Sequence, residues 1–259
     1  MDEAKLIDNL ISNTFTEDVN KLLQDAASCG YAGVVKILLD DSRVDPSADN
    51  NFAINVATEY GHTEVVALLL KNPRVNPAAR SNSAIVKAAQ NDHVEIVKLL
   101  LADPRVDPSV NNNTVIISAA HNGRTKVVEL LLKDPRVDPR VEANYCIRIA
   151  SRNGHVGVVK LLLKDSRVDL MEVGNSVIIC AALYERELVM ITLLEFFKHK
   201  FNAAMFIETW RNVWNPIPLK FKHMMIGHIV KYQWHMNALF EQYLLLDLLP
   251  QISYFITAN

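Results

Sequence analysis

The stretch DPRVDP, Asp103–Pro108, organises this sequence because it returns at a fixed interval. The same six letters stand at Asp134–Pro139, and variants stand at Asp41–Pro46 (DSRVDP), Asn72–Pro77 (NPRVNP) and Asp165–Leu170 (DSRVDL). Equivalent residues of successive copies lie 31 positions apart. A period of this length predicts an array of structural repeats that stack one on the next.

Further residue types keep the same interval. Arginine and then valine occupy the middle of every copy, asparagine recurs from Asn20 to Asn175, and isoleucine recurs from Ile54 to Ile178. No insertion interrupts this register between Asn20 and about Leu194. We therefore predict about six repeats of 31 residues in 20–197, preceded by a helical segment or cap in 1–19.

Each repeat predicts two short helices. The recurring asparagine is expected to cap the first helix, because its side-chain oxygen can accept a hydrogen bond from a free N–H of the first turn. Glycine, as at Gly61, is expected to end that helix because it adopts positive φ readily; Asp92 and Glu185 replace it in two repeats. The second helix, as in VVALLL (Val65–Leu70), is apolar over more than half of its circumference. It must therefore be buried between neighbouring repeats.

These features resemble the ankyrin repeat. GHTEVVALLLK (Gly61–Lys71) and GHVGVVKLLLK (Gly154–Lys164) are similar to that family's turn and second helix, and Ile54–Ala57 is similar to its first helix. The 31-residue repeats also resemble arrays in protists and large DNA viruses. The resemblance implies an all-α fold, an ankyrin-like helical repeat solenoid. The usual repeat has about 33 residues and opens with Thr-Pro-Leu-His, which is absent here, so we expect a compact connector with little or no β-hairpin.

The connector, the segment around DPRVDP or its variants that joins one repeat to the next, has two interpretations. Its five arginines, on a fixed step, could form a positive track for an anion or a nucleic acid. Alternatively, each arginine pairs with an aspartate of its own or the adjacent loop, such as Asp103 or Asp107, and this interpretation is favoured. Pro104 is expected to end the second helix, and the central valine is expected to face inward.

The composition argues against several classes of function. Half of the 259 residues are apolar and the net charge is −2, which disfavours bulk nucleic-acid binding. Three distant cysteines fit neither a disulfide framework nor a zinc site. His62, His93 and His155 share one repeat position, too far apart to bind one metal ion, and are interpreted as stabilising the turn. The sequence has no phosphate-binding loop, no G-x-S-x-G and no H-E-x-x-H, so no enzyme activity, cofactor or metal is expected.

The sequence also predicts where the protein resides. It has no basic-then-apolar signal pattern and no apolar run long enough to span a bilayer. We expect an intracellular, cytoplasmic protein, in the host cytoplasm if the source is viral. A monomer is expected.

The predicted function is non-catalytic protein–protein interaction. Two regions vary between repeats, just before the glycine and just ahead of the asparagine, and the ankyrin resemblance implies that they line a concave binding face. Aromatic residues beside the asparagine add anchors of the kind that dominate interfaces. Any single one of these residues could instead be ordinary surface variation. The candidate partner-binding residues are Asp49, Phe52, Glu59, Tyr60, Arg80, Gln90, Asn111, His121, Glu142, Tyr145, Arg148 and Arg152.

Residues 198–259 differ from the repeats. They hold all three tryptophans, with six basic and three acidic residues. One interpretation is a helical cap on the end of the solenoid. The alternative is a substrate adaptor whose C-terminal module recruits ubiquitin ligase machinery, because some similar ankyrin proteins of large DNA viruses carry an F-box-like helix pair there. Leu245–Ile256 matches that pattern only in its Leu-Pro start.

Overall fold

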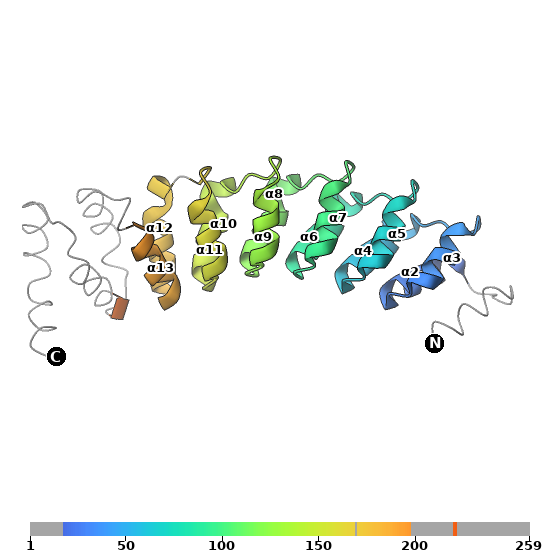
Figure 1. The fold of residues 1–259 in the computed structure, drawn as a ribbon, viewed down its shortest axis with the longest axis horizontal. Coiled ribbons are helices and arrows are strands. Elements are labelled where there is room, and N and C mark those ends of the chain that lie inside the picture. The colour runs from blue at the N-terminus through green and yellow to red at the C-terminus, as the bar shows by residue number, and fades with distance from the viewer. Residues whose placement is uncertain (1–17, 169, 198–219, 222–259) are drawn as a thin grey trace, which may run out of the picture. The chain divides into compact units, whose positions relative to one another are not determined.

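The computed structural model describes residues 18–168, 170–197 and 220–221. Within these ranges the chain forms twelve α-helices, α2 to α13, and no β-strand (Figure 1). The expected all-α repeat fold is confirmed, and so are compact connectors in place of β-hairpins among the described residues. The chain divides into an N-terminal unit (Met1–Val141) and a C-terminal unit (Glu142–Asn259).

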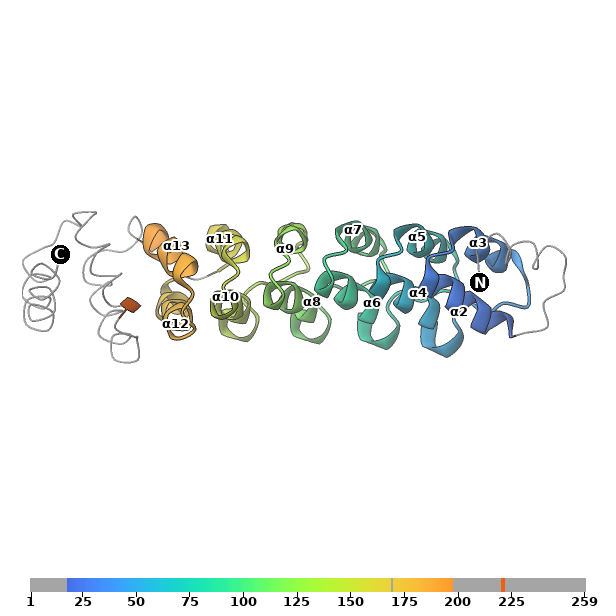
Figure 2. The same cartoon turned by 90° about the horizontal axis from the view of Figure 1, so that it is seen from below.

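The N-terminal unit contains four helix pairs in two layers (Figure 2). The first helices α2, α4, α6 and α8 pack side by side in one layer, and the second helices α3, α5, α7 and α9 pack in the other. Each first helix also packs on the second helix of its own repeat. The bounds are α2 (Val19–Cys29), α3 (Ala32–Asp40), α4 (Ala48–Tyr60), α5 (Thr63–Lys71), α6 (Ala79–Gln90), α7 (Val94–Ala102), α8 (Val110–His121) and α9 (Thr125–Leu132).

The C-terminal unit continues with two further pairs, in which α13 packs against both α11 and α12. Lys220 Nζ lies 3.1 Å from Glu187 Oε2, and Phe221 is fully buried. The predicted cap or effector module in 198–259 otherwise lies outside the described residues, as does most of the predicted N-terminal segment, so those boundaries stay predictions. The bounds are α10 (Val141–Asn153), α11 (Val156–Lys164), α12 (Leu170–Leu183) and α13 (Glu187–Phe197).

The core lies between the two layers and recurs in each repeat. On α5, Val65, Val66 and Leu69 are buried, while Leu68 and Leu70 are half-buried against the neighbouring repeats. Burying a side chain of this size contributes about 1.5–3 kcal/mol, so each stacked repeat stabilises the next. The expectation that the connector valine faces inward is also confirmed, at Val44, Val75, Val106, Val137 and Val168.

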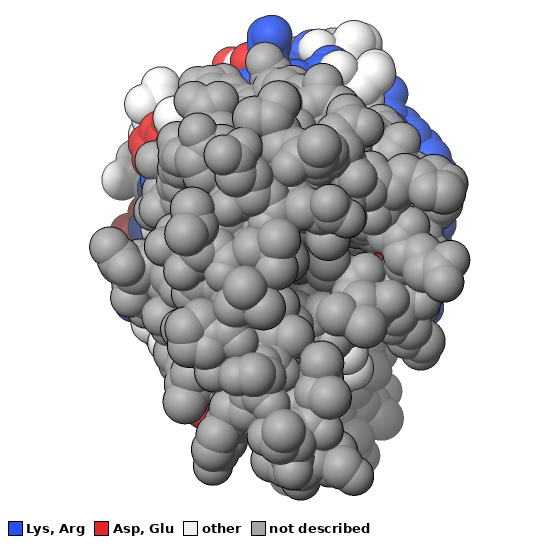
Figure 3. Space-filling view, turned by 90° about the vertical axis from the view of Figure 1, so that its left-hand side faces the viewer, with Lys and Arg blue, Asp and Glu red and all other residues white. Residues whose placement is uncertain are grey.

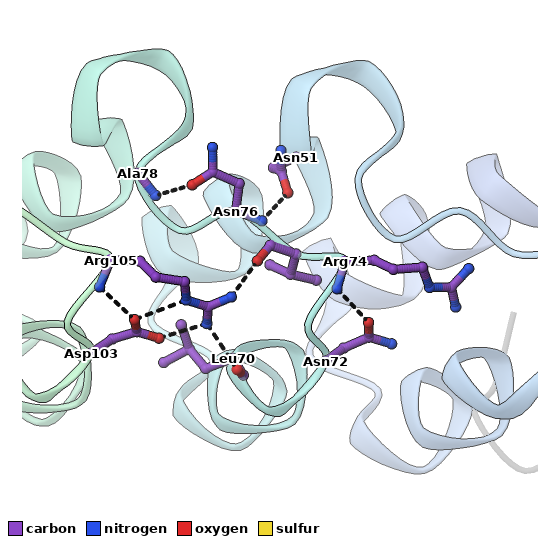
Figure 4. Close-up of polar contacts among 9 residues, drawn as sticks. Asn51, Leu70, Asn72, Arg74, Asn76, Ala78, Asp103 and Arg105 are labelled. Atoms are coloured by element: carbon purple, nitrogen blue, oxygen red, sulfur yellow. Dashed lines mark hydrogen bonds and ion pairs between the residues drawn. The ribbon is translucent and has the colours of Figure 1, made fainter.

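The prediction that asparagine caps the first helix of its own repeat is wrong. Asn82 has a φ of 58° and ends a left-handed turn that precedes the right-handed helix. Its Oδ1 accepts a hydrogen bond from the backbone N–H of Asp107 in the next connector, at 3.1 Å. Asparagine suits this position because it tolerates positive φ and supplies an acceptor to a connector N–H that is only partly exposed to water. The same bond joins Asn20 to Asp45, Asn51 to Asn76 (Figure 4) and Asn113 to Asp138.

The glycine position ends the first helix as predicted. Gly61 has a φ of 82°, and a Cβ atom there would lie 2.7 Å from the ring of His93. The position therefore needs both the conformation and the missing side chain. Asp92 and Glu185 also adopt positive φ, 65° and 55°, in the repeats that lack the glycine.

Gly61→Ala is expected to lower the free energy of unfolding by about 1–3 kcal/mol, because alanine is strained at positive φ and its methyl group meets the His93 ring. Urea titration followed by circular dichroism measures the loss. Gly157→Ala, inside α11, is the control and is expected to stabilise by up to about 1 kcal/mol, since alanine favours helix. Equal stability of Gly61→Ala and the parent protein would contradict the argument.

Asn82→Gly is expected to destabilise by about 1–3 kcal/mol, although glycine suits the φ of 58° better than asparagine does. The change removes the acceptor for the Asp107 N–H and leaves that partly buried group without this side-chain partner. Asn82→Ala, which loses the same hydrogen bond and adds backbone strain, is expected to lose more. Chemical denaturation of the three proteins tests this order, and an unchanged midpoint for Asn82→Gly would show that the bond contributes nothing.

Candidate functional site

The twelve candidate residues lie on the first helices, most of them near one of the two ends, and Arg148 lies in the middle of α10. Nine of them are exposed, and Phe52, Tyr145 and Arg148 are half-buried. Eight belong to the N-terminal unit, and Glu142, Tyr145, Arg148 and Arg152 belong to the C-terminal unit. The candidates therefore form two groups, one on each unit.

A left-handed turn opens the first helices α4, α6, α8 and α10, and the sequence did not predict it. Each turn has three consecutive residues other than glycine with φ between 49° and 61°. Such residues cost about 1–2 kcal/mol each relative to ordinary helix, less for asparagine and aspartate. In the sequence, only the abundance of Asn, Asp and Ser at the start of the first helices indicates this left-handed turn. The turns are Asp49–Asn51, Arg80–Asn82, Asn111–Asn113 and Glu142–Asn144.

Three of the candidates contact one another across two of these turns. Arg80 Nη2 donates to the backbone oxygen of Asp49 at 2.6 Å, and its guanidinium lies 5.8 Å from the centre of the Phe52 ring. The Asp49 carboxylate accepts a hydrogen bond from Gln24 at 2.6 Å. The structure thus brings Asp49, Phe52 and Arg80 into one cluster, in which the Arg80 guanidinium contacts both the Asp49 backbone and the half-buried Phe52 ring.

At the other end of the first helices, the backbone is held by the repeat that follows. Glu59 accepts a hydrogen bond at its backbone oxygen from Asn91, and His93 Nε2 lies 3.1 Å from the same oxygen. Arg124 donates to the backbone oxygen of Gln90 at 2.8 Å. The interpretation of the repeated histidines as turn-stabilising residues is confirmed at His93 by this contact and at His62 by its contact with the Ser28 oxygen, at 2.9 Å, and stays a prediction at His155.

The side chains at these helix ends stay exposed. Tyr60 is 62% exposed, the most exposed large aromatic side chain among the described residues. The Glu59 carboxylate pairs with Lys87 of the next first helix. Glu59 and Tyr60 thus combine a fixed backbone with side chains that face solvent.

In the C-terminal unit the candidates gather around two arginines of α10. Arg148 donates to the backbone oxygen of Glu142 at 2.9 Å, and its guanidinium lies 5.6 Å from the centre of the Tyr145 ring. Arg152 lies 4.5 Å from the centre of the Tyr184 ring. Sequence reasoning missed Tyr184; the signal was its position, four repeats after Tyr60 in the same register.

The connector arginines are bound within the array (Figure 4). Arg105 Nη2 lies 2.6 Å from the Asp103 carboxylate, and the same guanidinium donates to the backbone oxygens of Val75 and Leu70, at 2.7 and 3.0 Å. The prediction that arginine pairs with an aspartate of its own loop is confirmed at Arg43, Arg105, Arg136 and Arg167. Because their donors point to aspartates and carbonyls, these arginines do not supply an open track for an anion.

These pairs shift the acidity of the connector aspartates. The side-chain hydrogen bond from Arg43 lowers the pKa of Asp41 to about 2. Hydrogen bonds from Arg105 and Arg136 likewise lower the pKa of Asp103 and of Asp134, against the opposing effect of burial. The carboxylates stay charged well below neutral pH, so the connectors remain paired.

Other kinds of site find no support among the described residues. These residues contain no group of three or more His, Cys, Asp or Glu side chains that could hold a metal ion. None of the helices that can be described is long and apolar enough to cross a membrane. Charges of both signs are visible at the edges of the face drawn in Figure 3.

The stacked pairs of antiparallel helices define a helical repeat protein. Residues 74–143 match the family model of ankyrin repeats, with three copies. No curated protein matches the chain. The family match and the repeated helix pairs together show that this chain contains ankyrin repeats. Ankyrin repeats generally mediate protein–protein interactions and are typically non-catalytic.

The folded protein is expected to lose stability as the pH falls from about 4 towards 2. The aspartates with lowered pKa contribute stability that is present above their unfolded pKa, about 3.9, and is lost as the pH falls through the folded value. Asp103→Asn is expected to flatten this dependence and to cost about 1 kcal/mol at neutral pH. Asn72→Asp, which gives Arg74 the carboxylate that its connector lacks, is expected to steepen it. Denaturant unfolding at several pH values in this range measures the free energy of unfolding. Identical slopes of this free energy against pH for the parent, Asp103→Asn and Asn72→Asp would refute the account.

Proposed function

We propose that this ankyrin repeat protein is a non-catalytic scaffold that binds another protein through the exposed ends of its first helices, the concave face in ankyrin proteins. One observation carries the proposal: on these helices the constant positions are buried and the variable positions are exposed. Ile54, Ile85, Ile116 and Ile147 are at most 1% exposed. Five residues further along, the position before the turn changes from Glu59 to Gln90, His121 and Arg152, all exposed.

The chemistry of this face suits selective recognition. Within the N-terminal unit a negative, a neutral and an imidazole side chain follow one another at equivalent positions, at Glu59, Gln90 and His121, so a partner must match this order of side chains. Tyr60 adds an exposed aromatic side chain of the kind that anchors interfaces. Specificity would thus come from side chains that differ between repeats.

The backbone beneath this face is already held. Hydrogen bonds from the next repeat fix the helix ends at Glu59 and Gln90, so binding needs little further ordering of the chain. A preformed surface lowers the entropy lost on association. This supports binding by a rigid scaffold over folding upon binding.

The compartment and the assembly state belong to the same proposal. No disulfide joins Cys29, Cys146 or Cys180, which suits a reducing intracellular compartment such as the cytoplasm. We propose that the chain acts as a monomer there. The adaptor alternative depends on residues 198–259, which lie almost wholly outside the described residues.

The triple variant Glu59→Ala, Gln90→Ala, His121→Ala is expected to lose the proteins that the parent chain captures in an affinity pull-down. Its three changes remove exposed side chains, among them the Glu59 carboxylate of an exposed ion pair, so stability should fall by about 1 kcal/mol. The matched control changes Lys36, Lys98 and Lys160, exposed residues of the second helices, to alanine and should keep the partners. Recovery of the same proteins at equal yield by the triple variant would refute binding through the first-helix ends.

A further inference from the structure

Two arginines of the C-terminal unit differ from the connector arginines. Arg148 and Arg152 lie one turn apart on α10, and neither forms an ion pair with a carboxylate of the described residues. Arg152 is exposed, and its guanidinium makes no hydrogen bond within the described part of the chain. Arg148 uses one donor for the Glu142 oxygen, and its Nε is buried without a partner. Both guanidinium groups thus keep donors that are not satisfied.

Aromatic rings hold both guanidinium groups. Arg148 lies over Tyr145 and Arg152 over Tyr184, at 5.6 and 4.5 Å from the ring centres. A guanidinium stacked on a ring keeps its N–H donors at the edge, where they can bind a carboxylate in a bidentate manner. The rings therefore limit the rotation of the arginines and prepare them for a planar acceptor.

The two positive charges act on the same region of α12. Burial raises the pKa of the Cys180 thiol, and the charges of Arg148 and then Arg152 oppose that shift. Both arginines are thus close enough to influence the Cys180 thiol on α12.

An exposed apolar cluster adjoins the ring that holds Arg152. Leu183, Tyr184 and Leu188 are 46%, 41% and 69% exposed at the turn between α12 and α13. In the earlier repeats the positions of Leu183 and Leu188 hold polar residues or glycine, such as Glu59 and Glu64. The C-terminal unit thus presents arginines and apolar side chains together.

We infer that the C-terminal unit binds an acidic peptide segment of a partner protein, with carboxylates on Arg148 and Arg152 and an apolar side chain on Leu183 and Leu188. The inference rests on the proposed function for the nature of the partner and adds its chemistry. Charge complementarity favours a separate protein over residues 198–259 of this chain, because that segment carries six basic and three acidic residues.

The test uses the full-length chain and a fluorescein-labelled peptide of repeated Glu-Glu-Leu triplets, followed by fluorescence anisotropy. The parent protein is expected to bind this peptide, more weakly as salt rises from about 50 to about 200 mM, and not to bind the Gln-Gln-Leu peptide. Arg152→Gln is expected to weaken binding about tenfold. Arg152→Lys, which keeps the charge and loses the planar fork, should weaken it about threefold. Lys160→Gln removes the same charge from the exposed side of α11 and should bind as the parent does.

Several results would overturn the inference. One is an equal affinity of Arg152→Gln and the parent protein for the Glu-Glu-Leu peptide. Another is equal binding of the Glu-Glu-Leu and Gln-Gln-Leu peptides by the parent protein. Binding only when phosphoserine replaces the glutamates would also exclude the acidic-peptide assignment. Thermal unfolding of Arg152→Gln near that of the parent ensures that a loss of binding reflects the site.

The outcome is separable from that of the proposed function. Partner loss by the Glu59/Gln90/His121 variant, with no binding of the acidic peptide, would refute only this inference. Retention of all partners by that variant, with peptide binding that depends on Arg152, would refute binding through the first-helix ends of the N-terminal unit and support the acidic-peptide site.

Discussion

Hydrogen bonds from side chains of one repeat to the backbone of its neighbour hold this array together. Arg105 reaches back to Val75, Asn82 accepts from Asp107, and His93 contacts Glu59. Each satisfies a backbone group that a single repeat would leave without a partner, and such bonds contribute about 0.5–1.5 kcal/mol each, more where a charge takes part. A single repeat therefore lacks hydrogen-bond partners for part of its backbone, just as it lacks neighbours that would bury its apolar side chains.

The same constraint explains where variation is tolerated. The bonds use the backbone of the helix ends and connectors, together with a small set of side chains at fixed positions. The side chain of Gln90 takes no part in holding the next repeat, because only its backbone oxygen is bound by Arg124. Positions of this kind can change in charge and size while the backbone keeps its course. A rigid frame and a variable surface thus arise from one arrangement.

Much of this arrangement could be predicted from the sequence, because its cause is local. The helix pairs follow from apolar periodicity, the helix end at Gly61 from its backbone freedom, and the pairing of Arg105 with Asp103 from their separation by two residues. The role of Asn82 could not be predicted, because its partner is 25 residues away and is defined only once the repeats stack. The left-handed turns were missed for a similar reason, since the strain of three such residues is tolerated only where the surrounding repeats hold them.

The binding candidates were only partly predictable. Exposure follows from the repeat register, so the residues before the glycine position were identified correctly as surface residues. Their contacts depend on neighbours in other repeats, as with Arg152 and Tyr184. Tyr184 occupies the repeat position of Tyr60, but the three repeats between them have asparagine there. An interrupted pattern of this kind does not predict a contact.

The last described helix pair breaks the rules that the other repeats follow. Glu185 adopts a φ of 55° where glycine is usual, which costs about 1–2 kcal/mol. Leu183 and Leu188 are exposed where earlier repeats carry polar residues or glycine. Asp92 also replaces the glycine, at a φ of 65°, but no exposed apolar cluster accompanies it. Folding alone gives no reason for strain and exposed apolar surface together at one turn, because glycine and polar residues build the same turn at lower free energy in most other repeats. Local violations of this kind concentrate at functional sites, where a partner compensates for them. The departures from the repeat therefore carry as much functional information as its regularity.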